Sequence, residues 1–340
     1  MARPAEQDRA RGARAAIVPA TPSPRVRSVF AAMVGRMLRR DFHAVRLARG
    51  SRAALEAVDG GARPALVVLN HASWWDPLVA ISAWRAFFPS RAPYGPIDRH
   101  ELARFAIFRR VGLFGVDPDD PATLGAMRGY LAEIAARDPR FAFVLTPQGA
   151  FADVREKVVP RPGAAAIAAA LAPDRAVSIA IEYAFWTDRK PEVFVRAEPI
   201  ACAGAGLLGW QRRIAAAMQA NQDALAALVR ARDAAAFEPF APAFTPRTSG
   251  ANPFYDLWMR LTGRRVDAAL GEAREVGRGA GSGMAHGMTQ DVAQDVAQDV
   301  TQGMAHGMTH GMTSERGVRS DRVERDASEL RAREPDGVER

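Results

Sequence analysis

Cysteine and long apolar segments are scarce in this 340-residue chain, and each scarcity excludes a class of protein. The single cysteine, Cys202, cannot form an intramolecular disulfide, so a disulfide framework is excluded and a reducing compartment is favoured. No segment reaches the roughly 18 apolar residues that a membrane-spanning helix needs. The apolar run at residues 15–18 is too short for the core of a signal peptide. We therefore expect neither a signal peptide nor a spanning helix.

Two motifs that mark common enzyme classes are also missing. Ser73 is not part of a Gly-x-Ser-x-Gly turn, so we interpret it as a loop or cap hydroxyl rather than a nucleophile. The glycine-rich run at residues 277–283 has no strand before it and no helix after it, so it is not a dinucleotide-binding fingerprint.

The charge balance favours anionic partners. The formal net charge is +8, and arginine supplies nearly all of the positive charge. Such a balance suits a phospholipid surface, an acyl carrier or a nucleic acid. No nucleic-acid motif is present, and much of the arginine falls in flanks that we expect to be helical or disordered, so we predict no nucleic-acid partner.

Short apolar runs alternate with helical patterns between residues 65 and 200, which predicts an α/β domain with a mixed sheet wrapped by helices. With 48% hydrophobic residues the chain can bury a large core. We expect strands over residues 64–69, 93–97, 112–117, 141–145, 176–183 and 192–200. We expect helices over residues 25–47, 78–88, 102–111, 164–171, 207–236 and 254–261.

Composition divides the chain into three parts. Residues 1–24, rich in Ala, Arg and Pro, are predicted to be a disordered leader, and residues 25–265 a single domain with its core at 60–200. Residues 266–340 contain short Gln-Asp-Val and His-Gly-Met repeats, which are too polar to stack, so we predict a disordered tail. Tail histidines could weakly bind a soft metal. We favour low-complexity sequence instead and predict no metal site.

The first helical segment is amphipathic and basic. Apolar residues from Val26 to Phe42 recur at intervals of three and four, on one face of a helix. Arginines flank this face at positions 25, 27, 36, 39 and 40. Two interpretations are open: the helix lies on an anionic membrane surface, or it packs on the domain with its arginines in solvent.

The sequence around residues 70–77 reads as a strand end, a tight loop and a helix start. His71 leaves the strand, and Asp76 stands as N-cap before Pro77, which is favourable at the first helical position. The two side chains can therefore meet. A carboxylate that orients an imidazole makes its other nitrogen a general base, typically worth about 10²–10⁴-fold in rate. The alternative is a helix cap with a nearby polar histidine.

Two motifs resemble those of the glycerolipid acyltransferases, the family that includes bacterial 1-acylglycerol-3-phosphate acyltransferases. Asn-His-x4-Asp-Pro at residues 70–77 is similar to the first. Thr-Pro-Gln-Gly at residues 146–149, with Arg161-Pro162-Gly163 before a helix, is similar to the family's Pro-Glu-Gly and Lys/Arg-x-Gly motif. The resemblance covers about residues 25–200 and continues weakly to about residue 265.

This resemblance implies O-acyl transfer from acyl-CoA or acyl carrier protein to a lipid hydroxyl in phospholipid biosynthesis. The acceptor it implies is 1-acylglycerol-3-phosphate or a similar lysolipid. His71 would be the general base, oriented by Asp76. No cofactor and no metal are implied, and the location would be peripheral, on the cytoplasmic face of an anionic membrane. The residues that it implies bind substrate are Asn70, Gln148, Gly149 and Arg161.

Two positions depart from the family pattern. The place where the family has a phosphate-binding arginine holds Asp117, and Gln148 stands where Glu is usual. An acid at the first position would repel phosphate, and the amide at the second exchanges a charge for N–H donors. Two alternatives stay open: an acyltransferase with a non-phosphate acceptor, such as a glycosylated carotenoid or another hydroxylated lipid, and a non-catalytic lipid-binding protein. The His71–Asp76 pair argues against the second, because binding alone needs no base.

Overall fold

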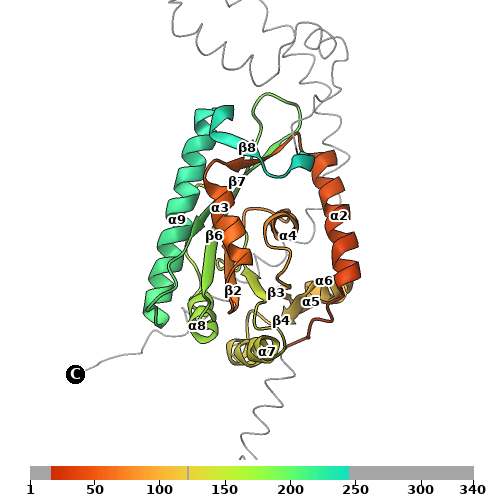
Figure 1. Ribbon diagram of the computed structural model, residues 1–340, viewed down its shortest axis with the longest axis vertical. Helices are drawn as coiled ribbons and strands as arrows, with labels where there is room; N and C mark the ends of the chain where they lie inside the picture. The colour runs from red at the N-terminus through yellow and green to blue at the C-terminus, as the bar shows by residue number, and fades with distance from the viewer. Residues whose placement is uncertain (1–16, 121, 245–340) are drawn as a thin grey trace, which may run out of the picture. The chain divides into compact units, whose positions relative to one another are not determined.

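The computed structural model describes residues 17–120 and 122–244. These residues form an eight-stranded sheet with helices on both of its faces (Figure 1). The strands are β1 Val45–Ala48, β2 Ala65–Leu69, β3 Pro93–Asp98, β4 Leu113–Val116, β5 Ala142–Leu145, β6 Arg175–Ala184, β7 Glu192–Pro199 and β8 Phe237–Pro239. The α-helices are α2 Pro24–Asp41, α3 Ser51–Glu56, α4 Asp76–Phe87, α5 Arg99–Arg104, α6 Ile107–Val111, α7 Thr123–Arg137, α8 Pro162–Leu171 and α9 Leu207–Ala231.

The sheet is mixed, with the order β4-β3-β5-β2-β6-β7-β1-β8. Its first five strands run parallel to one another. Strand β7 is antiparallel to β6, β1 is parallel to β7, and β8 is antiparallel to β1. The predicted α/β class with a mixed sheet wrapped by helices is therefore confirmed.

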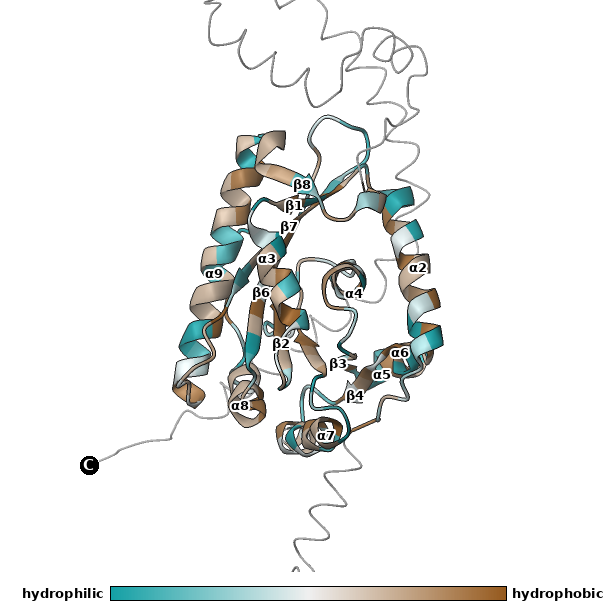
Figure 2. Ribbon diagram, in the orientation of Figure 1, coloured by the Kyte–Doolittle hydropathy of each residue, from teal (hydrophilic) through white to brown (hydrophobic). Residues whose placement is uncertain are grey.

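Strand β2 shows how the core is divided. Ala65, Val67 and Leu69 face a cluster that includes residues of α2, α3 and α4. Leu66 and Val68 face the opposite cluster, which includes residues of α7, α8 and α9. All five side chains are buried, as expected for a parallel strand covered on both faces. Figure 2 shows the apolar colouring of β2 between the two helix layers.

The predicted helix over residues 25–47 is wrong at its carboxyl end. Helix α2 ends at Asp41, and Phe42 has extended backbone angles. Residues 45–48 form β1, which pairs with β7 and is buried along its whole length. The pairing includes an ion pair between Arg46 and Glu192, whose side chains are both buried. Pairing with β7 therefore makes residues 45–48 a strand although the local sequence pattern is helical.

Two other predicted helices differ from their predicted bounds. The helix over residues 207–236 ends at Ala231, because Arg232 takes left-handed backbone angles, and a 3-10 turn follows at Ala234–Ala236. The helix over residues 102–111 is divided into α5 and α6, since Phe105 between them is not helical.

Some elements were not predicted, and some predictions fall outside the described residues. Helices α3 and α7 and strand β8 had no expected counterpart. Within the predicted leader, Ile17 is buried and Val18 forms a bridge with Gly115, so this part packs on the domain. Residues 1–16, the helix over 254–261 and the tail over 266–340 lie outside the described residues. Over residues 17–120 and 122–244, no helix combines the length and apolar character needed to cross a bilayer.

Gly112 joins α6 to β4 and requires glycine for two reasons. Its φ is +126°, and a Cβ there would lie 2.2 Å from the carbonyl oxygen of Pro93. We expect Gly112→Ala to lower the free energy of unfolding by about 2 kcal/mol or more. The control is Gly129→Ala, in the exposed interior of α7 with open space around it, which should raise that free energy by about 0.5–1 kcal/mol. Denaturant unfolding measures both, and equal effects would contradict the strain argument.

Candidate functional site

The motif residues meet at one edge of the sheet. His71 follows β2, Gln148 follows β5, and Tyr183 lies near the end of β6. Strands β5, β2 and β6 are parallel neighbours; β5 and β2 end at nearly the same level, and β6 continues beyond them to Ala184. In α/β sheets this edge is the usual place for ligands to bind.

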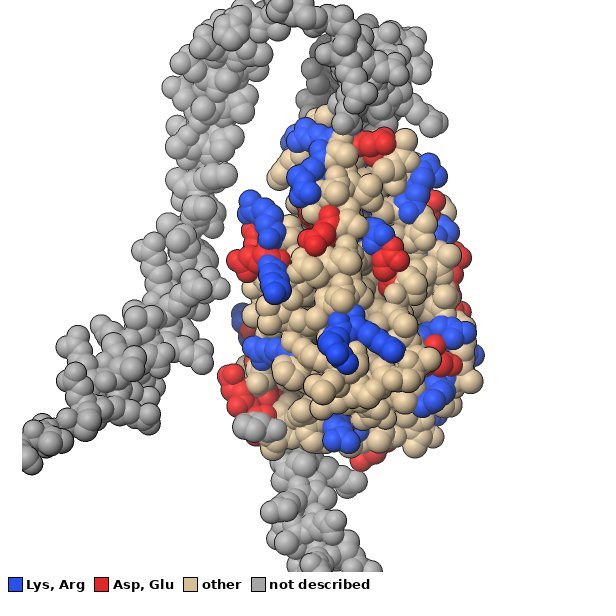
Figure 3. Space-filling view, turned by 90° about the vertical axis from the view of Figure 1, so that its left-hand side faces the viewer, with Lys and Arg blue, Asp and Glu red and all other residues tan. Residues whose placement is uncertain are grey.

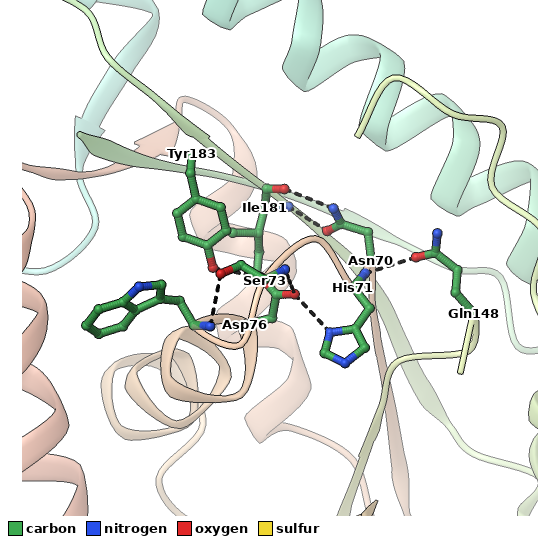
Figure 4. Close-up of polar contacts among 8 residues, drawn as sticks. Asn70, His71, Ser73, Asp76, Gln148, Ile181 and Tyr183 are labelled. Atoms are coloured by element: carbon green, nitrogen blue, oxygen red, sulfur yellow. Dashed lines mark hydrogen bonds and ion pairs between the residues drawn. The ribbon is translucent and has the colours of Figure 1, made fainter. Parts of the chain in front are cut away.

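His71 and Asp76 contact each other directly. The Nδ1 atom of His71 lies 3.0 Å from Oδ2 of Asp76 (Figure 4). The Asp76 side chain has no exposed surface, whereas that of His71 is 19% exposed. A carboxylate only accepts hydrogen bonds, so the proton sits on Nδ1 and the lone pair of Nε2 is left available. The ring can therefore take up a proton at Nε2.

Asp76 was predicted as the N-cap of its helix, and that prediction is wrong by one residue. The N-cap is Trp75, which makes no side-chain cap bond, and Asp76 is the first residue of α4. Its Oδ2 accepts the backbone N–H of Ser73 at 2.8 Å, so the carboxylate points back across the loop toward His71. The Ser73 hydroxyl accepts from Trp75 N–H at 3.3 Å, in agreement with its predicted role in the loop.

Tyr183 supplies the third donor to the Asp76 carboxylate. Its hydroxyl donates to Oδ1 at 2.7 Å. Burial and the neighbouring Asp76 charge raise the pKa of Tyr183 well above its ordinary value, so the hydroxyl stays protonated and keeps donating. Because a fully buried carboxylate loses its water, these protein donors compensate for its desolvation.

Gln148 and Asn70 position the backbone around the histidine. The side-chain oxygen of Gln148 accepts the backbone N–H of His71 at 2.9 Å. The Asn70 amide bonds both the N–H and the carbonyl of Ile181, at 2.8 and 2.9 Å, and so ties the end of β2 to β6. The structure thus gives Asn70 a structural contact, and its role in substrate binding stays a prediction.

Gly149 and Arg161 are brought together across the second motif. Gly149 has a φ of +69°, and a Cβ there would lie 2.6 Å from Nε of Arg161. The Arg161 N–H donates to the Pro147 carbonyl at 2.8 Å, and Arg161 is the N-cap of α8. Glycine therefore lets the exposed guanidinium lie against the loop backbone beside Gln148.

A loop after the second motif covers the histidine ring. The aromatic ring of Phe151 lies 4.3 Å from the imidazole of His71, and Phe151 is itself exposed. The N–H of Ala152 donates to the His71 carbonyl at 2.8 Å. These contacts hold residues 151–152 against the first motif.

A cavity of about 650 Å³ opens beside this site. Its walls come from the end of α2, the loop after His71, the loop after Phe151, and the β6–β7 hairpin. The lining residues are Asp41, Phe42, Ala72, Ser73, Trp75, Asp153, Val154, Arg155, Glu182, Tyr183, Phe185 and Pro191. Trp75 packs on Phe42 with ring centres 4.9 Å apart, while Trp74 stacks on its outer side and is exposed.

Tyr183, Phe151 and Glu182 were not predicted as site residues. A hydroxylated aromatic near the carboxyl end of an apolar strand, and a lone aromatic in a polar loop, were the available signals. Neither is specific, because the contacts join segments far apart in the chain. For a metal, the described residues offer no cluster of three or more His, Cys, Asp or Glu side chains.

Tyr183→Phe removes one donor from the buried Asp76 carboxylate and changes little else. We expect it to lower the free energy of unfolding by about 1.5–3 kcal/mol, as for a hydrogen bond to a charged group. The control is Tyr94→Phe, because the half-buried Tyr94 hydroxyl has no hydrogen bond to another described residue, and its loss should have a smaller effect. Chemical denaturation compares the two variants, and equal losses would remove the special role of Tyr183.

Comparisons with known proteins give likenesses among solved structures. The fold is similar to the crystal structure of the 1-acyl-sn-glycerophosphate (LPA) acyltransferase PlsC from Thermotoga maritima, with 15% sequence identity and a TM-score of 0.40. The match covers 59% of this chain and 81% of that chain. No protein-family model matches, and no curated protein matches. A likeness this distant assigns no residue, so the site is interpreted from its own geometry.

Proposed function

We propose that this chain is an O-acyltransferase that moves a fatty acyl group from acyl-CoA or acyl carrier protein to a lipid hydroxyl. The observation that carries the proposal is the His71–Asp76 pair: a buried carboxylate holds Nδ1 and leaves Nε2 available as a base. Binding alone would not need this arrangement, which argues against a non-catalytic lipid-binding protein.

The proposed reaction is a single displacement. Nε2 of His71 takes the proton of the acceptor hydroxyl while the oxygen attacks the thioester carbonyl carbon. The tetrahedral intermediate carries the negative charge on the former carbonyl oxygen. Its collapse forms the ester, breaks the carbon–sulfur bond and expels the thiolate, which takes the proton from the imidazolium. Asp76 stays ionised throughout and stabilises the imidazolium.

Gln148, Gly149 and Arg161 are proposed to position the substrates. Gln148 uses its oxygen on His71, so its amide N–H groups are the donors that face substrate oxygens. The Gly149 N–H already donates to the Thr146 carbonyl at 3.1 Å and is not a free donor. The Arg161 guanidinium at the start of α8 suits an anionic group, such as a phosphate of the substrates.

Peripheral binding to an anionic membrane is proposed for α2. Val29 is 71% exposed and Met33 is 43% exposed on this helix, where Arg25 and Arg36 are also exposed. Apolar side chains beside arginines suit the surface of an anionic bilayer. Arg27, expected to flank this face, is buried instead and donates to the Val111 carbonyl. On the face that carries α9, basic and acidic side chains are interspersed (Figure 3).

The acceptor that the family resemblance implies is 1-acylglycerol-3-phosphate or a similar lysolipid in phospholipid biosynthesis. Asp117, where the family has an arginine, follows β4. Its carboxylate oxygen Oδ2 lies 3.9 Å from a guanidinium nitrogen of Arg99. This carboxylate disfavours a phosphate near it. A non-phosphate acceptor is therefore the second candidate.

His71→Ala should lower turnover by at least about 10²-fold, because it removes the general base. The measurement is thiol release from acyl-CoA and from acyl carrier protein, with lysophosphatidic acid and with a monoacylglycerol as acceptors. His100→Ala is the matched control, since His100 is exposed on α5, and it should retain wild-type turnover. A cooperative thermal unfolding transition shows that the fold survives, at a lower melting temperature because the Asp76 carboxylate loses one donor. Wild-type turnover in His71→Ala would exclude His71 from the mechanism.

Arg161→Gln should raise the KM for acyl-CoA by about tenfold and change kcat less, because it removes a binding charge and not the base. The control is Arg128→Gln, which removes the same charge from the exposed face of α7. Steady-state kinetics at several ionic strengths separate a local contact from a general charge effect. Equal KM values for the two variants would contradict the assignment.

A further inference from the structure

The cavity beside the site has a negatively charged wall. Three carboxylates line it, from Asp41, Asp153 and Glu182, against one guanidinium, from Arg155. A phosphate placed in this cavity would therefore meet more negative than positive charge.

Among the described residues, Arg155 is the cation that lines the cavity, and it is already paired. Arg155 donates to both carboxylate oxygens of Asp153, at 2.8 and 2.6 Å, and this contact lowers the pKa of Asp153 well below its ordinary value. Asp41 is likewise bonded by Arg40, at 2.7 and 2.8 Å. These pairs leave Glu182 as the lining carboxylate that has no ion-pair partner among the described residues.

Glu182 is half-buried on β6, next to Tyr183. Burial raises the pKa of Glu182, and the charges of Arg230 and Arg155 partly oppose that rise. Its carboxyl oxygens can accept hydrogen bonds from the hydroxyl groups of a bound molecule, whereas a phosphate would be repelled while Glu182 is ionised.

Four aromatic side chains form much of the remaining wall. Phe42, Trp75, Tyr183 and Phe185 line the cavity together with Pro191. Flat aromatic rings pack against the C–H faces of a polyol or sugar and against the start of an acyl chain. Nearby carboxylates accept hydrogen bonds from the hydroxyl groups. The wall thus combines packing surface with hydrogen-bond acceptors.

The cavity lies next to the segments that carry the reacting residues. Ala72 and Ser73, directly after His71, line it, and so does Tyr183, which bonds Asp76. The segment that covers His71 through Phe151 continues into Asp153–Arg155 on the cavity wall. The cavity therefore shares its walls with the segments that hold His71 and Asp76 in place.

We propose that this cavity holds the acyl acceptor, and that the acceptor head group is an uncharged polyol or sugar without phosphate. The inference rests on the proposed function and selects the acceptor class for the same site. It gives the Arg161 side of the site to the anionic acyl donor. It also gives a reason for Asp117, because an acceptor without phosphate needs no arginine there.

Lipid binding tests the acceptor class without requiring turnover. His71→Ala protein is titrated with a monoacylglycerol and with lysophosphatidic acid of the same chain, both in neutral detergent micelles, and tryptophan fluorescence is followed. Trp75 lines the cavity, so Trp75→Phe identifies the part of the signal that comes from it. We expect the monoacylglycerol to bind at least about tenfold more tightly.

Charge reversal in the cavity, made in the same His71→Ala protein, provides the matched comparison. Glu182→Lys should shift the ratio of the two affinities by about tenfold toward lysophosphatidic acid. Glu182→Gln, which keeps the side-chain shape, should shift it less in the same direction. Glu133→Lys makes the same charge change on the exposed face of α7 and should leave the ratio as it was.

Three results would overturn the inference: equal or tighter binding of lysophosphatidic acid to His71→Ala, no binding of either lipid, or equal shifts in Glu182→Lys and Glu133→Lys. None of them bears on whether His71 is a base, because every binding measurement uses protein that lacks it. Loss of thiol release in His71→Ala decides that question separately.

Discussion

The Asp76 carboxylate, buried with three donors around it, is the interaction on which the site depends. Its oxygens accept from the His71 ring, the Ser73 backbone and the Tyr183 hydroxyl. The donors come from the loop after β2 and from β6. The buried Asp76 carboxylate therefore fixes that loop and that strand relative to α4. Since an unpaired buried carboxylate is costly, folding of this region and orientation of the imidazole are linked.

The parallel part of the sheet brings the remaining groups to the same place. Strands β5 and β2 end at nearly the same level, so the loops that carry Gln148 and His71 meet without a long connection. Gln148 holds the His71 backbone on one side, and Asp76 holds its ring on the other. The histidine thus lies between an arginine-bearing loop and a carboxylate-lined cavity, which is the basis for assigning separate donor and acceptor sides.

Much of the fold was predictable because its signals are local. The apolar runs that became β2, β5, β6 and β7 and the helical pattern of α4 were found within a few residues of their bounds. Strand β1 was missed because Val45–Ala48 continues a helical pattern, and only pairing with β7 makes it a strand. Helix α9 was predicted too long, since no local pattern marked the left-handed conformation of Arg232.

The sequence by itself determined the strand–loop–helix unit that sets His71 and Asp76 five residues apart, and the glycine that Arg161 packs against. These features follow from short-range geometry. The tertiary structure decided the rest: Tyr183 is 107 residues from Asp76 and Gln148 is 77 residues from His71 in the chain. The cavity walls come from four separate segments, so their charge exists only after the sheet brings them together. Contacts of this range depend on strand order, which no local pattern specifies.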